Sequence, residues 1–227
     1  EFLIRLDSDK INFGPDKFIP LFSESNFMSV VDRKVFLMAI GTIREYFKNT
    51  KKSFCFNINI SPKQSANSQY LHFVKETLRL TPVYNQKLMI EITETNAISQ
   101  KTGSAFIDGL HAMGIQAAID DFGTDYNSLE TPLSMSFDMV KFSRSLINKA
   151  LISRRSKNFL SQITKACRTL DAELCAEGIE TLEMKDALSP FCFDKFQGYL
   201  FARPMPVKDA ARLLLAAELK ELKEQKQ

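Results

Sequence analysis

The chain has 227 residues, of which 44% are hydrophobic and 25% are charged, and its formal net charge is +3. These values lie close to the average of globular proteins, so they exclude a disordered or fibrous chain. The small and dispersed positive charge lacks the basic patch expected of a protein that binds duplex DNA or RNA. The length fits a single α/β domain of barrel size.

The cysteines and the apolar segments indicate the compartment. Four cysteines show no paired spacing, and three of them lie in apolar segments, where a reduced thiol behaves as a small hydrophobic group. This pattern favours a reducing setting, so we expect a cytoplasmic domain. No apolar run approaches the roughly 20 residues that span a bilayer, and no signal peptide is evident. A domain of a longer, membrane-tethered protein remains compatible with this pattern.

Short β-rich segments alternate with longer stretches of helical period. We expect strands over residues 1–6, 53–61, 87–94, 114–121, 138–143, 172–178 and 196–202. Helices are expected over residues 26–48, 67–80, 99–113, 144–170, 181–189 and 206–225. This alternation is typical of βα units and a parallel sheet. The opening segment is already strand-like, so we expect the domain to begin before residue 1.

Polar side chains gather at the ends of the expected strands, whose bodies are apolar on both faces. The polar residues at these positions are Glu1, Asn59, Glu91, Glu94, Asp120, Asp121, Lys141, Glu177, Glu180 and Gln197. In a closed parallel barrel the carboxyl ends of the strands converge on the face that carries the chemistry of barrel enzymes. We therefore expect these side chains to meet at one mouth of a barrel.

Two adjacent carboxylates, Asp120 and Asp121, stand between an apolar run and a glycine turn. Like charges this close repel unless they are hydrated, share a proton or hold a cation. Each acidic residue alone also fits a structural role, such as a helix cap or an ion pair. Burying several of them without a counter-ion is unfavourable, so the set favours two hard cations such as Mg²⁺, Mn²⁺ or Ca²⁺.

Two such ions can activate water and stabilise the attacking and leaving oxygens of phosphodiester cleavage. Lys141, the basic residue of the set, is placed to orient the water or to neutralise charge on the phosphate. Its structural alternative is a salt bridge within the acidic cluster. Arg5, on the same expected strand as Glu1, is placed to reach a phosphate at the rim. His72 and His111 lie in helical segments without a ligand partner, which is typical of surface or interhelix residues.

Seven short motifs follow one another along the chain. They are EFLIR at residues 1–5, NIS at 59–61, EITE at 91–94, DDFGT at 120–124, VKF at 140–142 followed by RS, AEGIE at 176–180 and QGYLFARPMP at 197–206. In this order the chain resembles the EAL domain family, the cyclic di-GMP phosphodiesterases. The resemblance implies one EAL domain over residues 1–227, an α/β modified (β/α)₈ TIM-like barrel with one strand running against the others. It also implies that the first strand is missing here and that residues 207–227 form a final helix and tail.

The resemblance further implies hydrolysis of cyclic di-GMP to linear pGpG, a second-messenger reaction that depends on two Mg²⁺ or Mn²⁺ ions and that Ca²⁺ inhibits. The implied ligands of the first ion are Glu1, Asn59, Glu91 and Asp120. The implied ligands of the second ion are Asp120, Asp121 and Glu177, with Asp120 as the bridge. The implied catalytic residues are Lys141, which assists the water, together with Glu177 and Asp121.

The remaining implied roles concern the substrate and the loops. The implied contacts to the dinucleotide are Arg5, Gln197, Arg144 and Pro204. Glu94 would brace the loop that follows DDFGT, with Glu180 as nearby support. The resemblance also implies a homodimer through the face of the DDFGT loop and flanking sensory or GGDEF domains in the full-length protein.

Three positions depart from the family pattern. Phe2 replaces the signature alanine, Asp125 replaces a loop glycine and Ser143 replaces an aspartate. We expect the Phe2 side chain to point away from the metal face, because alternate residues of a strand face opposite sides. The departures keep a second hypothesis open, a degenerate EAL domain that binds cyclic di-GMP without turnover. A third hypothesis is a protein-interaction module that uses the helical segments 144–170 and 206–225.

Overall fold

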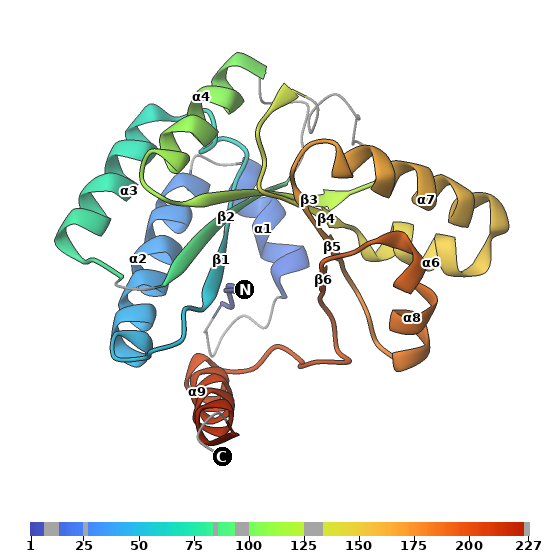
Figure 1. The fold of residues 1–227 in the computed structure, drawn as a ribbon. Coiled ribbons are helices and arrows are strands. Elements are labelled where there is room, and N and C mark those ends of the chain that lie inside the picture. The colour runs from blue at the N-terminus through green and yellow to red at the C-terminus, as the bar shows by residue number, and fades with distance from the viewer. Residues whose placement is uncertain (7–13, 25–26, 84–85, 94–99, 125–133, 225–227) are drawn as a thin grey trace.

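The computed structural model describes residues 1–6, 14–24, 27–83, 86–93, 100–124 and 134–224, and Figure 1 shows their arrangement. Six strands form one sheet in the order β1-β2-β3-β4-β5-β6, and all of their pairings are parallel. The strands are β1 (Cys55–Ile60), β2 (Lys87–Thr93), β3 (Gln116–Phe122), β4 (Met139–Phe142), β5 (Glu173–Ala176) and β6 (Lys195–Phe196). The sheet curls into part of a (β/α) barrel, as the motifs predict. The strand expected to run against the others is not among these six.

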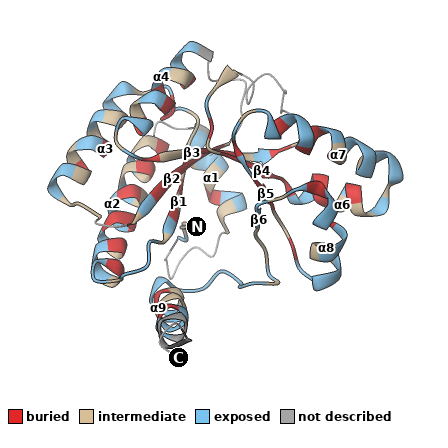
Figure 2. Cartoon of the chain, viewed as in Figure 1, coloured by how far each residue is buried: buried red, intermediate tan, exposed pale blue. Residues whose placement is uncertain are grey.

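The helices are α1 (Pro15–Glu24), α2 (Met28–Phe47), α3 (Ser68–Leu80), α4 (Gln100–His111), α6 (Arg144–Ile152), α7 (Arg154–Arg168), α8 (Leu182–Ala187) and α9 (Val207–Glu224), with a short 3₁₀ turn at Ser189–Phe191. In Figure 1, α2, α3 and α4 lie outside one half of the curled sheet and α6, α7 and α8 lie outside the other half, whereas α1 lies within the arch of the sheet in this view and α9 lies below it. Figure 2 shows buried residues along the strands and on the sheet-facing sides of the helices. Because both faces of each strand are covered, the strands read as nearly continuous apolar runs.

The N-terminal segment joins the sheet beside β1. The Phe2 N–H donates to the Asn57 carbonyl at 2.9 Å, and Phe2 forms an isolated parallel bridge with Ile58. The Phe2 ring stacks on Phe56 with centroids 5.9 Å apart, within the core between sheet and helices. The Phe2 side chain, which replaces the alanine of the family pattern, therefore points away from the barrel interior, as expected.

Several expected elements differ from the structure. The helix expected over 144–170 is two helices, because Ser153 is extended (φ −113°, ψ 123°) and its hydroxyl accepts the Ser156 N–H to start α7. Helix α1 was not expected, since it is short and contains Pro20. The strand expected over 196–202 ends at Phe196, because the chain turns at Gly198. In the segment 1–6, Phe2 alone pairs with the sheet.

Candidate active site

The polar residues at the strand ends rest on an apolar layer inside the barrel. That layer is a small separate core of Met89, Ala118, Met139 and Cys175. Side chains two residues apart on a strand face the same side. The residues two positions further along are Glu91, Asp120, Lys141 and Glu177. The period of the strands therefore brings four polar side chains from four strands onto one level.

Lys141 lies at the centre of a ring of acidic side chains, which we call the carboxylate cluster: Glu1, Glu91, Asp120 and Glu177. Its Nζ lies 2.8 Å from Glu91 Oε1 and 2.8 Å from Glu177 Oε1. The distances to Asp120 Oδ1 and Glu1 Oε2 are 3.0 and 3.7 Å. Burial opposes the charged form, but the four carboxylates raise the pKa of Lys141 above its ordinary value. Lys141 is thus an ammonium ion at neutral pH.

The carboxylates themselves resist full ionisation. Burial first, and then neighbouring acidic groups, raise the pKa values of Glu91 and Glu177 to about 7 against the attraction of Lys141. Burial and the charge of Asp120 also raise the pKa of Asp121. With Asp121 included, five carboxylates and one ammonium leave a formal charge of −4 when all are ionised. This surplus of negative charge calls for further cations.

Glu1 is the exception within the cluster, because two amides hold it. Asn59 Nδ2 donates to Glu1 Oε1 at 2.7 Å, and Gln197 Nε2 donates to Glu1 Oε2 at 2.6 Å. Burial opposes ionisation of Glu1, but Lys141 and these two donors outweigh it and lower the pKa of Glu1. Glu1 therefore links β1 to the segment that follows β6. Asn59, the implied metal ligand, and Gln197, the implied dinucleotide contact, thus both donate a hydrogen bond to Glu1 in the structure.

Asp121 leaves the strand alternation at a bulge. The register between β3 and β4 shifts between Ile119 and Phe122, and Asp121 adopts the left-handed conformation (φ 55°). Aspartate is one of the residues that tolerate this region. The bulge explains how two adjacent aspartates differ: Asp120 faces Lys141, whereas Asp121 is exposed next to it.

One oxygen of the cluster fits a metal ligand directly. Glu91 is completely buried, and among the described residues its Oε2 has no hydrogen-bond partner. An unpartnered buried carboxylate oxygen is unfavourable unless a cation or donor meets it. The donor set of carboxylate and amide oxygens suits Mg²⁺ or Mn²⁺. In the described part of the chain no ready-made metal site is formed, since the carboxylates point at Lys141.

The expected substrate contacts have different surroundings. Arg144 pairs with Glu180 at 2.7 Å, at the rim of the site. Arg5 is exposed and donates to the adjacent Ile4 carbonyl at 2.8 Å, so the structure does not bring it to the carboxylate cluster. Pro204 is exposed in the segment before α9. Glu94 and Asp125 lie outside the described residues.

Comparison with known proteins gives the family. A sequence model of the EAL domain family matches residues 1–204. The chain belongs to the EAL domain family. Its relatives include the probable cyclic di-GMP phosphodiesterase PdeN of Escherichia coli K12, at 29% identity over 88% of this chain and 39% of that protein. The cyclic di-GMP phosphodiesterase PdeL of the same strain is 29% identical over 91% of this chain and 58% of that protein.

Solved EAL structures have the same fold. The EAL enzyme Bd1971 with cAMP and cyclic di-GMP bound superposes with a TM-score of 0.81 at 25% identity, covering 88% of this chain and 56% of that one. The PaMucR phosphodiesterase in complex with c-di-GMP gives 0.77 at 26% identity, covering 86% and 80%. This EAL domain spans about two fifths or less of the first three curated relatives that it matches.

Two further polar residues near the site of this EAL domain, Asn57 and Asp32, belong to none of the motifs. Asn57 donates to Glu91 Oε1 at 2.7 Å. The sequence feature that could have indicated Asn57 is its position two residues before Asn59, which puts both side chains on the same face of β1. Asp32, buried on α2, accepts the Ser61 hydroxyl at 2.5 Å and the Ser61 N–H at 3.3 Å, which fixes the turn after β1. No local motif links Asp32 to that turn.

The departure at Ser143 keeps a structural function in this EAL domain. The Ser143 hydroxyl accepts the Leu146 N–H at 3.4 Å and so caps α6. Serine and aspartate are both favourable N-cap residues. The change therefore removes a carboxylate while the helix start is retained.

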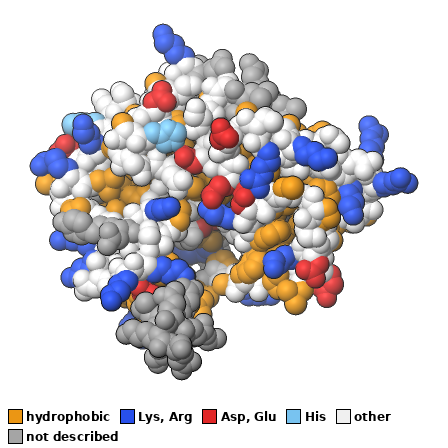
Figure 3. All heavy atoms as spheres, viewed as in Figure 1, with side chains coloured by type: hydrophobic (Ala, Val, Ile, Leu, Met, Phe, Trp, Pro, Cys, Tyr) orange, Lys and Arg blue, Asp and Glu red, His pale blue; other side chains and the backbone are white. Residues whose placement is uncertain are grey.

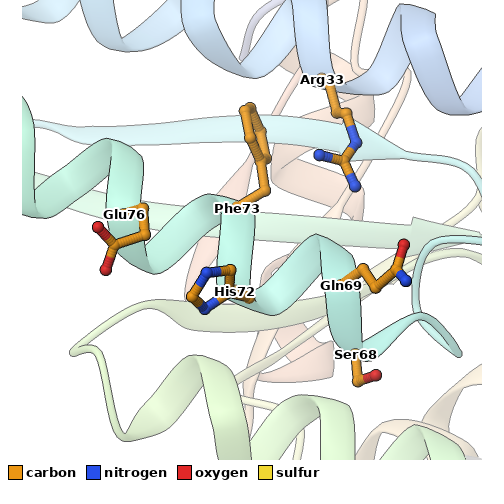
Figure 4. A pocket seen from close by; sticks show the side chains of 6 residues that line it. All are labelled: Arg33, Ser68, Gln69, His72, Phe73 and Glu76. Atoms are coloured by element: carbon orange, nitrogen blue, oxygen red, sulfur yellow. The ribbon is translucent and has the colours of Figure 1, made fainter.

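Among the described residues, one surface hollow lies away from the carboxylate cluster, between α2 and α3. Figure 3 shows acidic side chains near the middle of one face, with Lys and Arg side chains beside them. The hollow, of about 570 Å³, is lined by Arg33, Ser68, Gln69, His72, Phe73 and Glu76. In Figure 4 the polar side chains of Ser68, Gln69, His72 and Glu76 are spread along α3, and Arg33 comes from α2 opposite them. The Arg33 guanidinium lies over the Phe73 ring, and Glu76 pairs with Arg79.

The cysteines and the helices bear on the expectations of reduced thiols and of no membrane span. All four cysteines are free thiols. Among the described residues, no helix has the length and apolar character needed to cross a membrane.

Proposed function

We propose that this EAL domain hydrolyses cyclic di-GMP to linear pGpG with two Mg²⁺ or Mn²⁺ ions at the carboxylate cluster. The observation that carries this proposal is the ring of carboxylates around the buried Lys141, in which Glu91 is also buried and its Oε2 has no hydrogen-bond partner among the described residues. The relatives named as cyclic di-GMP phosphodiesterases, and the solved structures of EAL proteins with c-di-GMP, support the substrate.

The residues have distinct roles in this proposal. Glu1, Asn59, Glu91 and Asp120 would hold one ion, and Asp120, Asp121 and Glu177 would hold the other. When bound, the ions supply Lewis acidity, which activates water and neutralises charge on the phosphate. Lys141 stays protonated, so it donates hydrogen bonds and orients the water rather than accepting its proton. Asn59 and Gln197 hold Glu1 in place.

A turnover assay tests this function. Purified protein is incubated with cyclic di-GMP and Mg²⁺, Mn²⁺, Ca²⁺ or EDTA, and the products are separated by chromatography. We expect pGpG with Mg²⁺ or Mn²⁺ and intact substrate with Ca²⁺ or EDTA. Intact substrate with Mn²⁺ would contradict the enzyme proposal. Calorimetric binding of cyclic di-GMP would then indicate a receptor, and absence of binding an interaction module.

The raised pKa values predict that metal binding releases protons. Glu91 and Glu177, whose pKa values burial raises to about 7, keep protons in part at neutral pH, and a cation binds their ionised forms. We expect Mn²⁺ binding to release more protons at pH 7 than at pH 8.5. Calorimetry in two buffers of different ionisation enthalpy measures this number. Equal release at both pH values would contradict the prediction.

The same shifts give the sign of the effect on stability. A carboxyl whose pKa is raised in the folded state keeps its proton after the unfolded chain has lost it. Without divalent ions, the contribution of Glu91 and Glu177 to the free energy of unfolding therefore decreases as the pH rises from 4.5 to about 7. Bound cations would offset this loss.

Arg144 is proposed to bind a phosphate of the dinucleotide at the rim. Its side chain packs against Gly178, which has φ 70°, and a Cβ added there would collide with it. We expect Gly178→Ala to raise the KM for cyclic di-GMP about tenfold, because it displaces the guanidinium from Glu180. Gly114→Ala is the control, since Gly114 has φ 71° and open space around it. Equal KM values for the two variants would contradict the role of Arg144.

The wider context is also a proposal. Curated relatives include the oxygen sensor protein DosP and the bifunctional diguanylate cyclase/cyclic di-GMP phosphodiesterase MucR, of which this chain spans 24% and 28%. We propose flanking sensory or GGDEF domains for the full-length protein. A homodimer through the DDFGT-loop face stays a prediction, because residues 125–133 of that loop lie outside the described residues. Sedimentation of the purified domain tests it.

A further inference from the structure

We infer that Asn57 is a positioning residue, which turns one oxygen of Glu91 toward the metal site. This inference rests on the proposed function, because it concerns how the chain prepares a ligand for a divalent ion. Asn57 itself touches neither the ion nor the substrate in this account. It acts through Glu91 alone.

The geometry begins with the pairing of β1 and β2. The two strands are parallel, with Asn57 opposite Met89 and Asn59 opposite Glu91. Asn57 Nδ2 reaches forward to Glu91 Oε1 at 2.7 Å. Lys141 Nζ meets the same oxygen at 2.8 Å. Two donors, one neutral and one charged, thus converge on a single oxygen of Glu91.

The consequence lies in the other oxygen. Glu91 Oε2 is buried and has no hydrogen-bond partner among the described residues, although Glu91 lies inside the barrel among polar groups. A carboxylate held at one oxygen by two donors cannot rotate without breaking both bonds. Oε2 is therefore kept available for a hard cation, which seeks anionic oxygen.

The orientation of the Asn57 amide follows from chemistry. Lys141 can only donate, so the Glu91 Oε1 that it meets is an acceptor, and the Asn57 amide presents its nitrogen to that oxygen. Its oxygen then faces Cys55, whose Sγ lies 3.6 Å from Asn57 Oδ1. Partners that orient a metal ligand in this way typically contribute 10- to 100-fold in metal affinity or activity.

The experiment compares Mn²⁺ binding by the wild type with that by two near-isosteric variants. Asn57→Leu removes the donor while filling the space, and Asn57→Asp replaces the donor by an acceptor. By calorimetry without substrate, we expect Asn57→Leu to bind Mn²⁺ at least about tenfold more weakly than the wild type. Asn57→Asp should also bind more weakly than the wild type, but by less, because its added negative charge attracts the cation. Turnover should recover in part at saturating Mn²⁺, so the apparent KM for Mn²⁺ should rise more than kcat falls. A residue that only fills space would not produce this split.

Cys55→Ala is the matched control, because it lies on the same strand face and removes only the contact to Asn57 Oδ1. We expect it to bind Mn²⁺ like the wild type. Should Asn57→Leu fail to fold, Asn57→Ser gives the same comparison, since its short side chain cannot donate from the position of Nδ2. Wild-type affinity in the folded Asn57 variants would overturn the inference.

The outcomes separate this inference from the proposed function. A wild type that binds Mn²⁺ without hydrolysing cyclic di-GMP would contradict the enzyme proposal, yet weaker binding by the Asn57 variants would still support the inference. A wild type that hydrolyses the substrate, with Asn57 variants that bind Mn²⁺ equally well, would overturn the inference alone. A wild type that binds no Mn²⁺ would overturn both.

Discussion

Replacing Lys141 by methionine is expected to reduce turnover of cyclic di-GMP by about 10³-fold without loss of Mn²⁺ binding. The ammonium is the single cation amid four carboxylates in this cluster, and it is proposed to orient the water and neutralise the phosphate. Loss of one such fixed donor typically reduces kcat by roughly 10²–10³-fold. Removing a positive charge from the cluster also removes repulsion toward Mn²⁺, so the metal affinity should be retained or increased.

The Lys141→Met variant should also respond to metal in its stability. Without Mn²⁺, buried carboxylates that lose their ion-pair partner destabilise a fold by about 3–5 kcal/mol. Bound Mn²⁺ should restore most of this loss in a thermal melt. Lys195→Met is the control, since Lys195 pairs with Glu173 at the opposite ends of the strands and is exposed. Turnover by Lys141→Met within tenfold of the wild type would contradict the role of Lys141.

Replacing Glu91 by glutamine is expected to remove one of two bound Mn²⁺ ions and to reduce turnover by more than about 10²-fold. Outer partners of a ligand contribute roughly 10- to 100-fold, so loss of the ligand itself should exceed that range. The stability should change in the opposite direction. Because Glu91 is buried with a pKa raised to about 7, the neutral amide should stabilise the metal-free protein at pH 8.

The combination of lost activity and increased stability distinguishes a ligand from a structural residue. Calorimetry gives the Mn²⁺ stoichiometry, and thermal melts at pH 5.5 and pH 8 give the sign of the stability change. Glu173→Gln serves as the control, because that carboxylate is exposed and pairs with Lys195. A stoichiometry of two in Glu91→Gln would contradict the assignment of Glu91.

The arrangement of the carboxylate cluster followed from the sequence because it depends on one simple period. Strand residues that alternate in and out, together with parallel strands that end at one mouth, predict that Glu91, Asp120, Lys141 and Glu177 face each other. The distances of 2.8 to 3.0 Å from Lys141 to these carboxylates agree with that expectation. Glu1, expected in the same set, is held by Asn59 and Gln197 from the two edges of the described sheet.

Other features depend on contacts that no local pattern carries. The apolar residues keep a helical period across Ser153, so the period alone does not reveal that the helix ends there. Helix α1 contains Pro20, which argues against a helix, but its Phe18 side chain is buried in the fold. Asn57 donates to Glu91, which is 34 residues away in the chain, and Arg5 donates to the carbonyl of its own neighbour Ile4. The sequence indicates which side chains share a face, whereas their final hydrogen bonds depend on the packing of the whole barrel.

Anomalous diffraction from crystals grown with Mn²⁺ tests most directly whether divalent ions neutralise the carboxylate cluster. We expect two peaks roughly 3.5–4 Å apart, with one in contact with Glu91 Oε2 and Asp120 between them. A structure with saturating Mn²⁺ in which no peak lies at the cluster, and Lys141 still holds all four carboxylates, would contradict this expectation.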